Sequence, residues 1–157
     1  PLDTEALDAS LAACPTPGRF DVLQNEPLIL IDACHNPQSC ENFVSSLDEI
    51  NPDAALRPLL LTAALADKDV SGIVDVLVPA FPRIVVTQTM SDRAIPAQDL
   101  AQLVLDKLEE LGRPSSDLIE VVPSVSDAVE RLAAAGEAFV AAGTITLAGE
   151  VAGIMRG

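Results

Sequence analysis

The sequence predicts an α/β fold: a Rossmann-like, mostly parallel sheet with helices on both faces and one antiparallel strand at its edge. Two observations support this prediction. Short runs of four or five apolar residues recur along the chain, and the longer segments between them carry apolar residues at helical spacing. A length of 157 residues also suits one domain with a substantial hydrophobic core.

The beginning of the chain is predicted to form a connector followed by a hairpin. Residues 2–13 read as a short acidic helix that ends before the breaker Pro15–Gly18, so we expect residues 1–18 to be a connector. The apolar runs Phe20–Leu23 and Leu28–Asp32 are separated by a short polar segment. They predict two strands, of which the first lies antiparallel at the edge of the sheet.

After Pro37, predicted helices and strands alternate. Phe43, Leu47 and Ile50 lie on one face of the first helix because they are spaced at i, i+4 and i+7. The remaining predicted elements are a strand at Leu59–Ala63, a helix striped by apolar residues over Val70–Leu77, a strand at Ile84–Thr87, a helix over Leu100–Leu111 that Gly112 ends, a strand at Leu118–Val122, a helix from about Ser124, a strand at Ala138–Ala142 and a last helix at Thr144–Met155.

Composition argues against several classes of function. The formal net charge is −15 and the 9 Lys and Arg residues are scattered, whereas nucleic-acid binding needs clustered basic residues. No apolar run reaches the ~20 residues that cross a bilayer, and no signal-peptide pattern is present at the start. The 3 cysteines include no CxxC pair, which disfavours a disulfide framework or a zinc site. We expect a cytoplasmic protein without nucleic-acid or membrane partners, and, because the first residue is not Met, a piece of a longer protein.

Polar residues follow most of the predicted strands. In open α/β sheets ligands gather beyond the carboxyl ends of the strands, where a carboxylate can hold ribose hydroxyls and Lys or Arg can neutralise phosphate oxygens. The chain contains neither GxGxxG nor GxxxxGK[ST], so it carries no dinucleotide fingerprint and no P-loop. The candidate site residues are Arg19, Asp32, His35, Asn36, Lys68, Arg93 and Thr144.

Several of these candidates also have a purely structural interpretation. Asn36 before Pro37 matches an N-cap followed by the first helical residue, and Thr144 could cap the last helix. His35, the only histidine, could simply hydrogen-bond within its loop, and Arg93 could pin a loop. Spacing alone leaves both interpretations open.

Five short elements, in this order and spacing, carry a family resemblance. The chain resembles the C-terminal domain of the folylpolyglutamate synthase/dihydrofolate synthase family, which belongs to the Mur ligase superfamily. It departs from the family pattern where Ala33-Cys34 replaces Gly-Ala, where Asp92 replaces Pro and where Thr144 replaces Ser. The elements are Pro17-Gly18-Arg19-Phe20, Leu30-Ile31-Asp32-Ala33-Cys34-His35-Asn36-Pro37, Ala66-Asp67-Lys68-Asp69-Val70, Ser91-Asp92-Arg93-Ala94 and Ala142-Gly143-Thr144.

The resemblance implies an ATP-dependent ligase that uses Mg²⁺ and joins L-glutamate to folate or dihydropteroate through an acyl phosphate. It implies that residues 19–157 form a Mur ligase C-terminal-type domain, and that an N-terminal ATPase domain outside this chain holds the P-loop, most metal ligands and the folate pocket. We therefore expect no metal ligands here and no turnover by this chain alone. The implied roles are ATP contact for Arg19 and Asp32, ordering of the phosphate loop by His35 and Asn36, catalysis by Lys68 and His35, and substrate binding by Lys68, Arg93 and Thr144.

Two other readings remain open. A cell-wall ligase of the same superfamily would share the domain but use another acceptor. A non-catalytic nucleotide-binding or signalling module would also be α/β and acidic. A receiver-type signalling module, however, needs a lysine at the end of its last strand, where this chain has Ala142-Gly143-Thr144.

Overall fold

The computed structural model describes residues 19–113 and 117–157, which form a six-stranded sheet in the order β1-β2-β6-β3-β4-β5. β1 pairs antiparallel with β2, and the other neighbours are parallel, which confirms the predicted sheet. The helix and connector predicted within residues 1–18 lie outside the described residues. The elements are β1 Asp21–Asn25, β2 Leu28–Asp32, α2 Pro37–Ile50, the 3-10 helix η1 Ala54–Leu56, β3 Leu59–Thr62, α3 Val70–Leu77, the 3-10 helix η2 Val78–Ala80, β4 Ile84–Val86, α4 Ala97–Glu110, β5 Ile119–Val121, α5 Val125–Ala134, β6 Phe139–Ala142 and α6 Ile145–Arg156.

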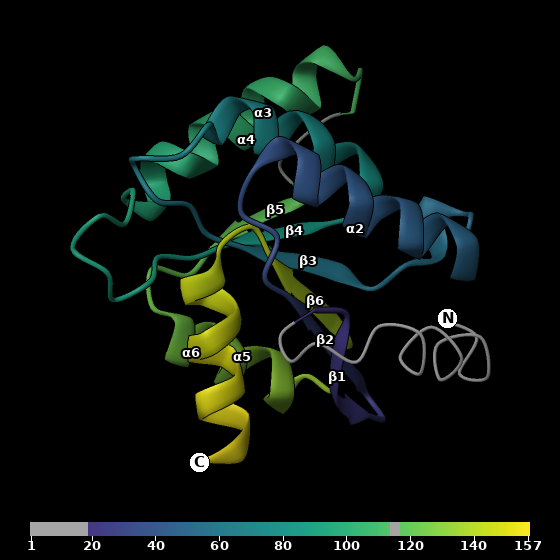
Figure 1. Cartoon of the computed structure of the whole chain (residues 1–157), viewed down its shortest axis with the longest axis vertical. Helices are drawn as coiled ribbons and strands as arrows, with labels where there is room; N and C mark the ends of the chain where they lie inside the picture. Colours follow the sequence, from purple (N-terminus) through teal and green to yellow (C-terminus); the bar gives the residue numbers. More distant parts are fainter. Residues whose placement is uncertain (1–18, 114–116) are drawn as a thin grey trace.

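Helices cover both faces of the sheet: α2, α3 and α4 on one face and α5 and α6 on the other (Figure 1). Because side chains alternate along a strand, Leu30 and Leu60 join the first core, whereas their neighbours Ile29 and Leu61 join the second. All four are at most 1% exposed, and full burial of such a side chain stabilises the fold by about 1.5–3 kcal/mol. Within residues 19–113 and 117–157, no helix is both long enough and apolar enough to cross a membrane.

Side-chain caps mark the beginnings of α2, α3, α5 and α6. A capping side chain satisfies an N–H of the first turn that has no partner inside the helix. The capping residues of α2, α3, α5 and α6 are Asn36, Asp69, Ser124 and Thr144. This confirms the structural interpretation of Asn36 and Thr144, and Gly112 follows the end of α4 as predicted.

The first strand differs from the prediction, because it begins at Asp21 and extends to Asn25. Phe20 instead adopts a left-handed backbone conformation with φ 49°. Its ring is buried and packs edge-on against Phe43, with 5.6 Å between ring centroids. Its N–H donates a hydrogen bond to the carboxylate of Asp32 instead of to a neighbouring strand. The strand therefore begins at the next residue, Asp21.

Candidate active site

The loops that follow β2, β6, β3 and β4 all lie at the carboxyl-terminal end of the sheet. These strands are adjacent and parallel, so their carboxyl ends share the edge at which ligands bind in open α/β sheets. β2 and β6 pair in parallel up to Asp32 and Ala142, so the loops after β2 and β6 begin side by side. The N–H of Ala66 donates to the carbonyl oxygen of Arg93 at 2.7 Å, which joins the loops after β3 and β4. We call these four loops, residues 32–36, 66–69, 88–94 and 143–144, the rim.

Asp32 ends β2, but its carboxylate points into the protein and the residue is 4% exposed. Its Oδ2 accepts a hydrogen bond from the N–H of Phe20 at 2.9 Å, and its Oδ1 accepts one from the N–H of Cys34 at 2.8 Å. The carboxylate therefore holds together the turn before β1 and the loop after β2. Its assignment as an ATP contact stays a prediction.

Burial shifts the pKa values of Asp32 and Cys34. Burial raises the pKa of Asp32 above its ordinary value of 3.8, against the opposing effects of the hydrogen bonds from Phe20 and Cys34 and of the positive charge of Arg19. Arg19 is exposed and lies close enough to act on that charge. A hydrogen bond with Cys40, together with burial, raises the pKa of the Cys34 thiol, so this thiol is not a nucleophile at neutral pH.

The predicted His-Asn-Pro element forms the entry to α2. The N–H of His35 donates to the hydroxyl of Ser39 at 3.0 Å, and its ring Nδ1 lies 3.2 Å from the carbonyl oxygen of Ala33. A carbonyl oxygen can only accept, so Nδ1 is the donor in a hydrogen bond at this contact, and in the neutral ring Nε2 is then the acceptor. Asn36 and Ser39 form a reciprocal capping box, with 2.8 Å between Asn36 Oδ1 and the Ser39 nitrogen. The proposed roles of His35 and Asn36 toward ATP stay predictions.

The loop after β3 presents an exposed ammonium group. The side chain of Lys68 makes no hydrogen bond or ion pair with any residue that the structure describes. Its two acidic neighbours are engaged elsewhere: Asp69 accepts from the N–H of Gly72 at 3.0 Å, and Asp67 pairs with Arg93 at 2.6 Å. Of the two predicted cations on this side of the rim, Lys68 is therefore free and Arg93 is committed to a carboxylate.

The turn after β6 packs tightly against the end of β3. Gly143 has φ 126°, and a Cβ there would lie 2.6 Å from Thr62 Oγ1 and 3.0 Å from the carbonyl oxygen of Ala63, so a larger residue does not fit. Thr144 is 1% exposed, and its hydroxyl accepts a hydrogen bond from the N–H of Thr146 at 3.0 Å. This hydroxyl caps α6, and its predicted contact with a substrate stays a prediction.

The sequence reasoning missed two residues that organise the site. Phe20 links Arg19 to Asp32 through its left-handed backbone and its buried N–H, and no periodicity indicates such a conformation. Asp67 pairs with Arg93 across 26 positions of sequence, and spacing alone does not indicate such a pair. The signals available for Asp67 were its place after a predicted strand and within one of the five family elements.

The exposed cations at the rim and in the turn before β1, which starts beside the end of β2, fit an anionic ligand. Arg19 and Lys68 carry positive charge at one edge of a strongly acidic chain, and guanidinium and ammonium groups can neutralise phosphate or carboxylate oxygens. His35 adds a ring nitrogen that can accept a hydrogen bond. Among the described residues, no group of three or more His, Cys, Asp and Glu side chains is arranged to hold a metal ion.

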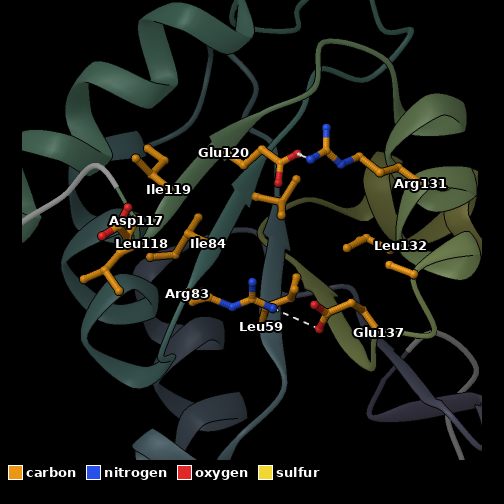
Figure 2. Close-up of a pocket in the computed structure, with 12 residues that line it drawn as sticks. Leu59, Arg83, Ile84, Asp117, Leu118, Ile119, Glu120, Arg131, Leu132 and Glu137 are labelled. Carbon is orange, nitrogen blue, oxygen red and sulfur yellow. Dashed lines mark hydrogen bonds and ion pairs between the residues drawn. The ribbon is translucent and has the colours of Figure 1, made fainter.

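A groove of about 330 Å³ lies at the other end of the sheet, beside the amino ends of β3, β4 and β5 (Figure 2). Two ion pairs frame it: Arg83 with Glu137 at 2.9 Å, and Arg131 with Glu120 at 2.6 Å. Leu132 lies between the two pairs in this view. None of the predicted site residues lines the groove, so the groove and the rim are separate features.

Comparisons with known proteins identify the relatives of this chain. The family described as "Mur ligase, glutamate ligase domain" matches residues 18–145. Dihydrofolate synthase/folylpolyglutamate synthase of Mycobacterium tuberculosis is 34% identical over 152 residues, which cover 92% of this chain and 30% of that protein. Folylpolyglutamate synthase of Lacticaseibacillus casei is 32% identical over 98 residues, which cover 61% of this chain and 22% of that protein.

Solved structures show the same fold. The crystal structure of M. tuberculosis folylpolyglutamate synthase complexed with ADP and AMPPCP matches with a TM-score of 0.77 and 27% identity, over 98% of this chain and 35% of that chain. The chain thus spans less than a third of the M. tuberculosis relative and about a third of the solved protein. The family match covers most of the sequence, including the rim up to Thr144. The chain therefore belongs to the family of Mur ligase glutamate ligase domains.

Proposed function

We propose that this chain is the C-terminal domain of an ATP-dependent ligase that adds L-glutamate to folate or dihydropteroate through an acyl phosphate. The observation that carries the proposal is the rim, where an unpaired lysine, Lys68, and an exposed arginine, Arg19, stand at the edge of a glutamate ligase domain. The names of the M. tuberculosis and L. casei relatives support folate as the acceptor class.

In this proposal the rim supplies charge and position rather than covalent chemistry. Phosphoryl and acyl transfer depend mainly on orientation and on stabilisation of developing negative charge. Arg19 and the loop of His35 and Asn36 would approach the phosphates of ATP, with Asp32 holding that loop in place. Lys68 would face the reacting carboxylate or the incoming glutamate, and Thr144 and Arg93 would border the glutamate site. ATP supplies the phosphoryl group that activates the acceptor carboxylate.

The proposed partner of this domain is an N-terminal ATPase domain of the same polypeptide. Relatives more than three times as long as the matched segment support this layout, with residues 1–18 as connector and residues 19–157 as the glutamate ligase domain. Closure of the two domains over the substrates would exclude water, which would otherwise hydrolyse an acyl phosphate. Mg²⁺ would be held mainly by the ATPase domain, and the proposed location of the enzyme is the cytoplasm.

A cell-wall ligase of the same superfamily is the second candidate, because the family match does not itself name the acceptor. The relatives named above favour the folate branch. A non-catalytic module is disfavoured by the free ammonium of Lys68, because no neighbouring carboxylate in the described part of the chain pairs with it.

The test is an assay of the natural polypeptide that contains this chain, with ATP, Mg²⁺, radiolabelled L-glutamate and, in separate reactions, folate, dihydropteroate or a cell-wall peptide precursor as acceptor. We expect ATP-dependent incorporation of glutamate, and a fall of about 100-fold or more when Lys68→Ala removes the charge at the reacting centre. Lys107→Ala is the matched control, because Lys107 lies on α4 and pairs with Asp75 and Glu110. Incorporation into a cell-wall peptide precursor only would establish the alternative, and no incorporation into any acceptor would refute the proposal. The 157-residue chain alone should form no product.

A further inference from the structure

The loops after β3 and β4 form a small pairing of their own beyond the edge of the sheet. Leu65 and Ala94 form an isolated antiparallel bridge. The N–H of Ala66 donates to the carbonyl oxygen of Arg93 at 2.7 Å, and the N–H of Ile95 donates to the carbonyl oxygen of Ala64 at 2.9 Å. Both loops project on the same side of the molecule, at the left of Figure 1. The backbones of the two loops are therefore held in register.

This pairing brings together side chains of opposite charge. Arg93 Nη1 lies 2.6 Å from Asp67 Oδ2, and the two side chains are 59% and 43% exposed. The backbone of Lys68 is fixed as well, because its N–H donates to the carbonyl oxygen of Leu65 at 3.2 Å and its carbonyl oxygen accepts from the N–H of Val70 at 2.9 Å. Only the side chain of Lys68 is left free to meet a ligand.

Both carboxylates beside Lys68 in the sequence have partners other than Lys68. Lys68 stands between two aspartates in the sequence. Here Asp69 is turned toward the first turn of α3, where it accepts from the N–H of Gly72, and Asp67 is held by Arg93. Each aspartate that could neutralise Lys68 thus has another partner.

We propose that Arg93 is a positioning residue that holds the carboxylate of Asp67 away from Lys68 and so keeps the Lys68 ammonium available to anionic groups of the substrates. The identity of those substrates rests on the proposed function. The contacts that support the role of Arg93 are all within this chain. It assigns Arg93 an action through Asp67 in place of a direct contact with the substrate.

The proposal predicts that a second substitution, at Asp67, reverses the effect of Arg93→Gln on Lys68. A general loosening of the loop would not be reversed in this way. In Arg93→Gln, Asp67 loses its charged partner, and we expect its carboxylate to turn to Lys68, which follows it in the sequence. In the double variant Arg93→Gln with Asp67→Asn, that carboxylate is gone, so Lys68 is free again. Arg93→Lys keeps a cation beside Asp67 and should behave like the native chain. A purely structural role would instead leave the double variant at least as impaired as Arg93→Gln.

The test measures the reactivity of Lys68 toward reductive methylation in the 157-residue chain, with the modified residue identified by mass spectrometry. Lys107, the only other lysine of the native sequence, is the internal reference in every variant, and in Arg93→Lys the added lysine at position 93 is scored separately. Because an exposed ion pair stabilises the protonated amine, Arg93→Gln should lower the Lys68 rate by about two- to fivefold relative to Lys107, and the double variant should restore it. Circular dichroism checks that each variant is folded.

An unchanged Lys68 rate in Arg93→Gln would overturn the proposal, and so would a rate that stays low in the double variant. Neither result depends on ligase activity. A natural polypeptide that joins no glutamate to any acceptor would refute the proposed function, while the methylation rates would still decide the role of Arg93.

Discussion

Replacement of Asp32 by alanine tests whether this buried carboxylate holds the site together. The change removes the acceptor for two buried N–H groups, those of Phe20 and Cys34. Each unsatisfied buried donor costs about 1–3 kcal/mol, and relief of the buried charge offsets part of that cost, so we expect Asp32→Ala to lower the free energy of unfolding by about 2–4 kcal/mol. For a chain of this size the melting temperature should fall by roughly 5–15 °C.

The assay for Asp32→Ala is urea unfolding at pH 7 followed by far-ultraviolet circular dichroism, because the chain contains neither Trp nor Tyr for fluorescence. Asp92→Ala is the matched control: Asp92 is exposed and has no side-chain partner among the described residues. The control should stay within about 0.5 kcal/mol of the native chain. Equal stabilities of the Asp32 and Asp92 variants would refute the reasoning.

Three further predictions concern Asp32 and the turn after β6. Burial raises the pKa of Asp32 above 3.8, so ionisation of this carboxyl group opposes folding, although its two hydrogen bonds persist in the ionised form. The free energy of unfolding of the native chain, relative to that of Asp32→Asn, should therefore be highest below pH 3.8 and fall as the pH rises through the raised pKa, as urea titrations at several pH values can measure. Gly143→Ala should lower the free energy of unfolding by about 1–3 kcal/mol, because the residue has a positive φ and its Cβ would meet Thr62 Oγ1; a neutral result in thermal melting would contradict the close approach. Thr144→Ala should cost about 1 kcal/mol through loss of the cap on α6, whereas Thr144→Ser should keep most of it; equal melting temperatures for the two variants would exclude the cap.

The α/β architecture could be predicted from sequence because its determinants are local. The buried strands are short apolar runs such as Leu59–Thr62, and the helices between them repeat apolar residues every three or four positions. The caps at Asn36 and Thr144 were also readable, since each stands directly before a helix. The start of β1 was placed one residue early because Phe20 is held by a residue 12 positions away.

The candidate site was predictable in its location but not in its internal pairing. Strand ends mark the rim, so Asp32 and Lys68 could be selected from their positions alone. Which way a side chain points depends on contacts that spacing does not encode: Asp32 turns inward to two backbone N–H groups, while Lys68 turns outward. The pair of Asp67 and Arg93 likewise depends on the neighbouring positions of β3 and β4 in the sheet.

Hydrogen–deuterium exchange of the natural polypeptide, with and without AMPPCP, Mg²⁺ and L-glutamate, tests most directly whether the rim is the ligand face. The account predicts slower exchange concentrated in residues 32–36, 66–69, 88–94 and 143–144. Protection confined to the groove framed by Arg83 and Arg131, with the rim unchanged, would contradict it.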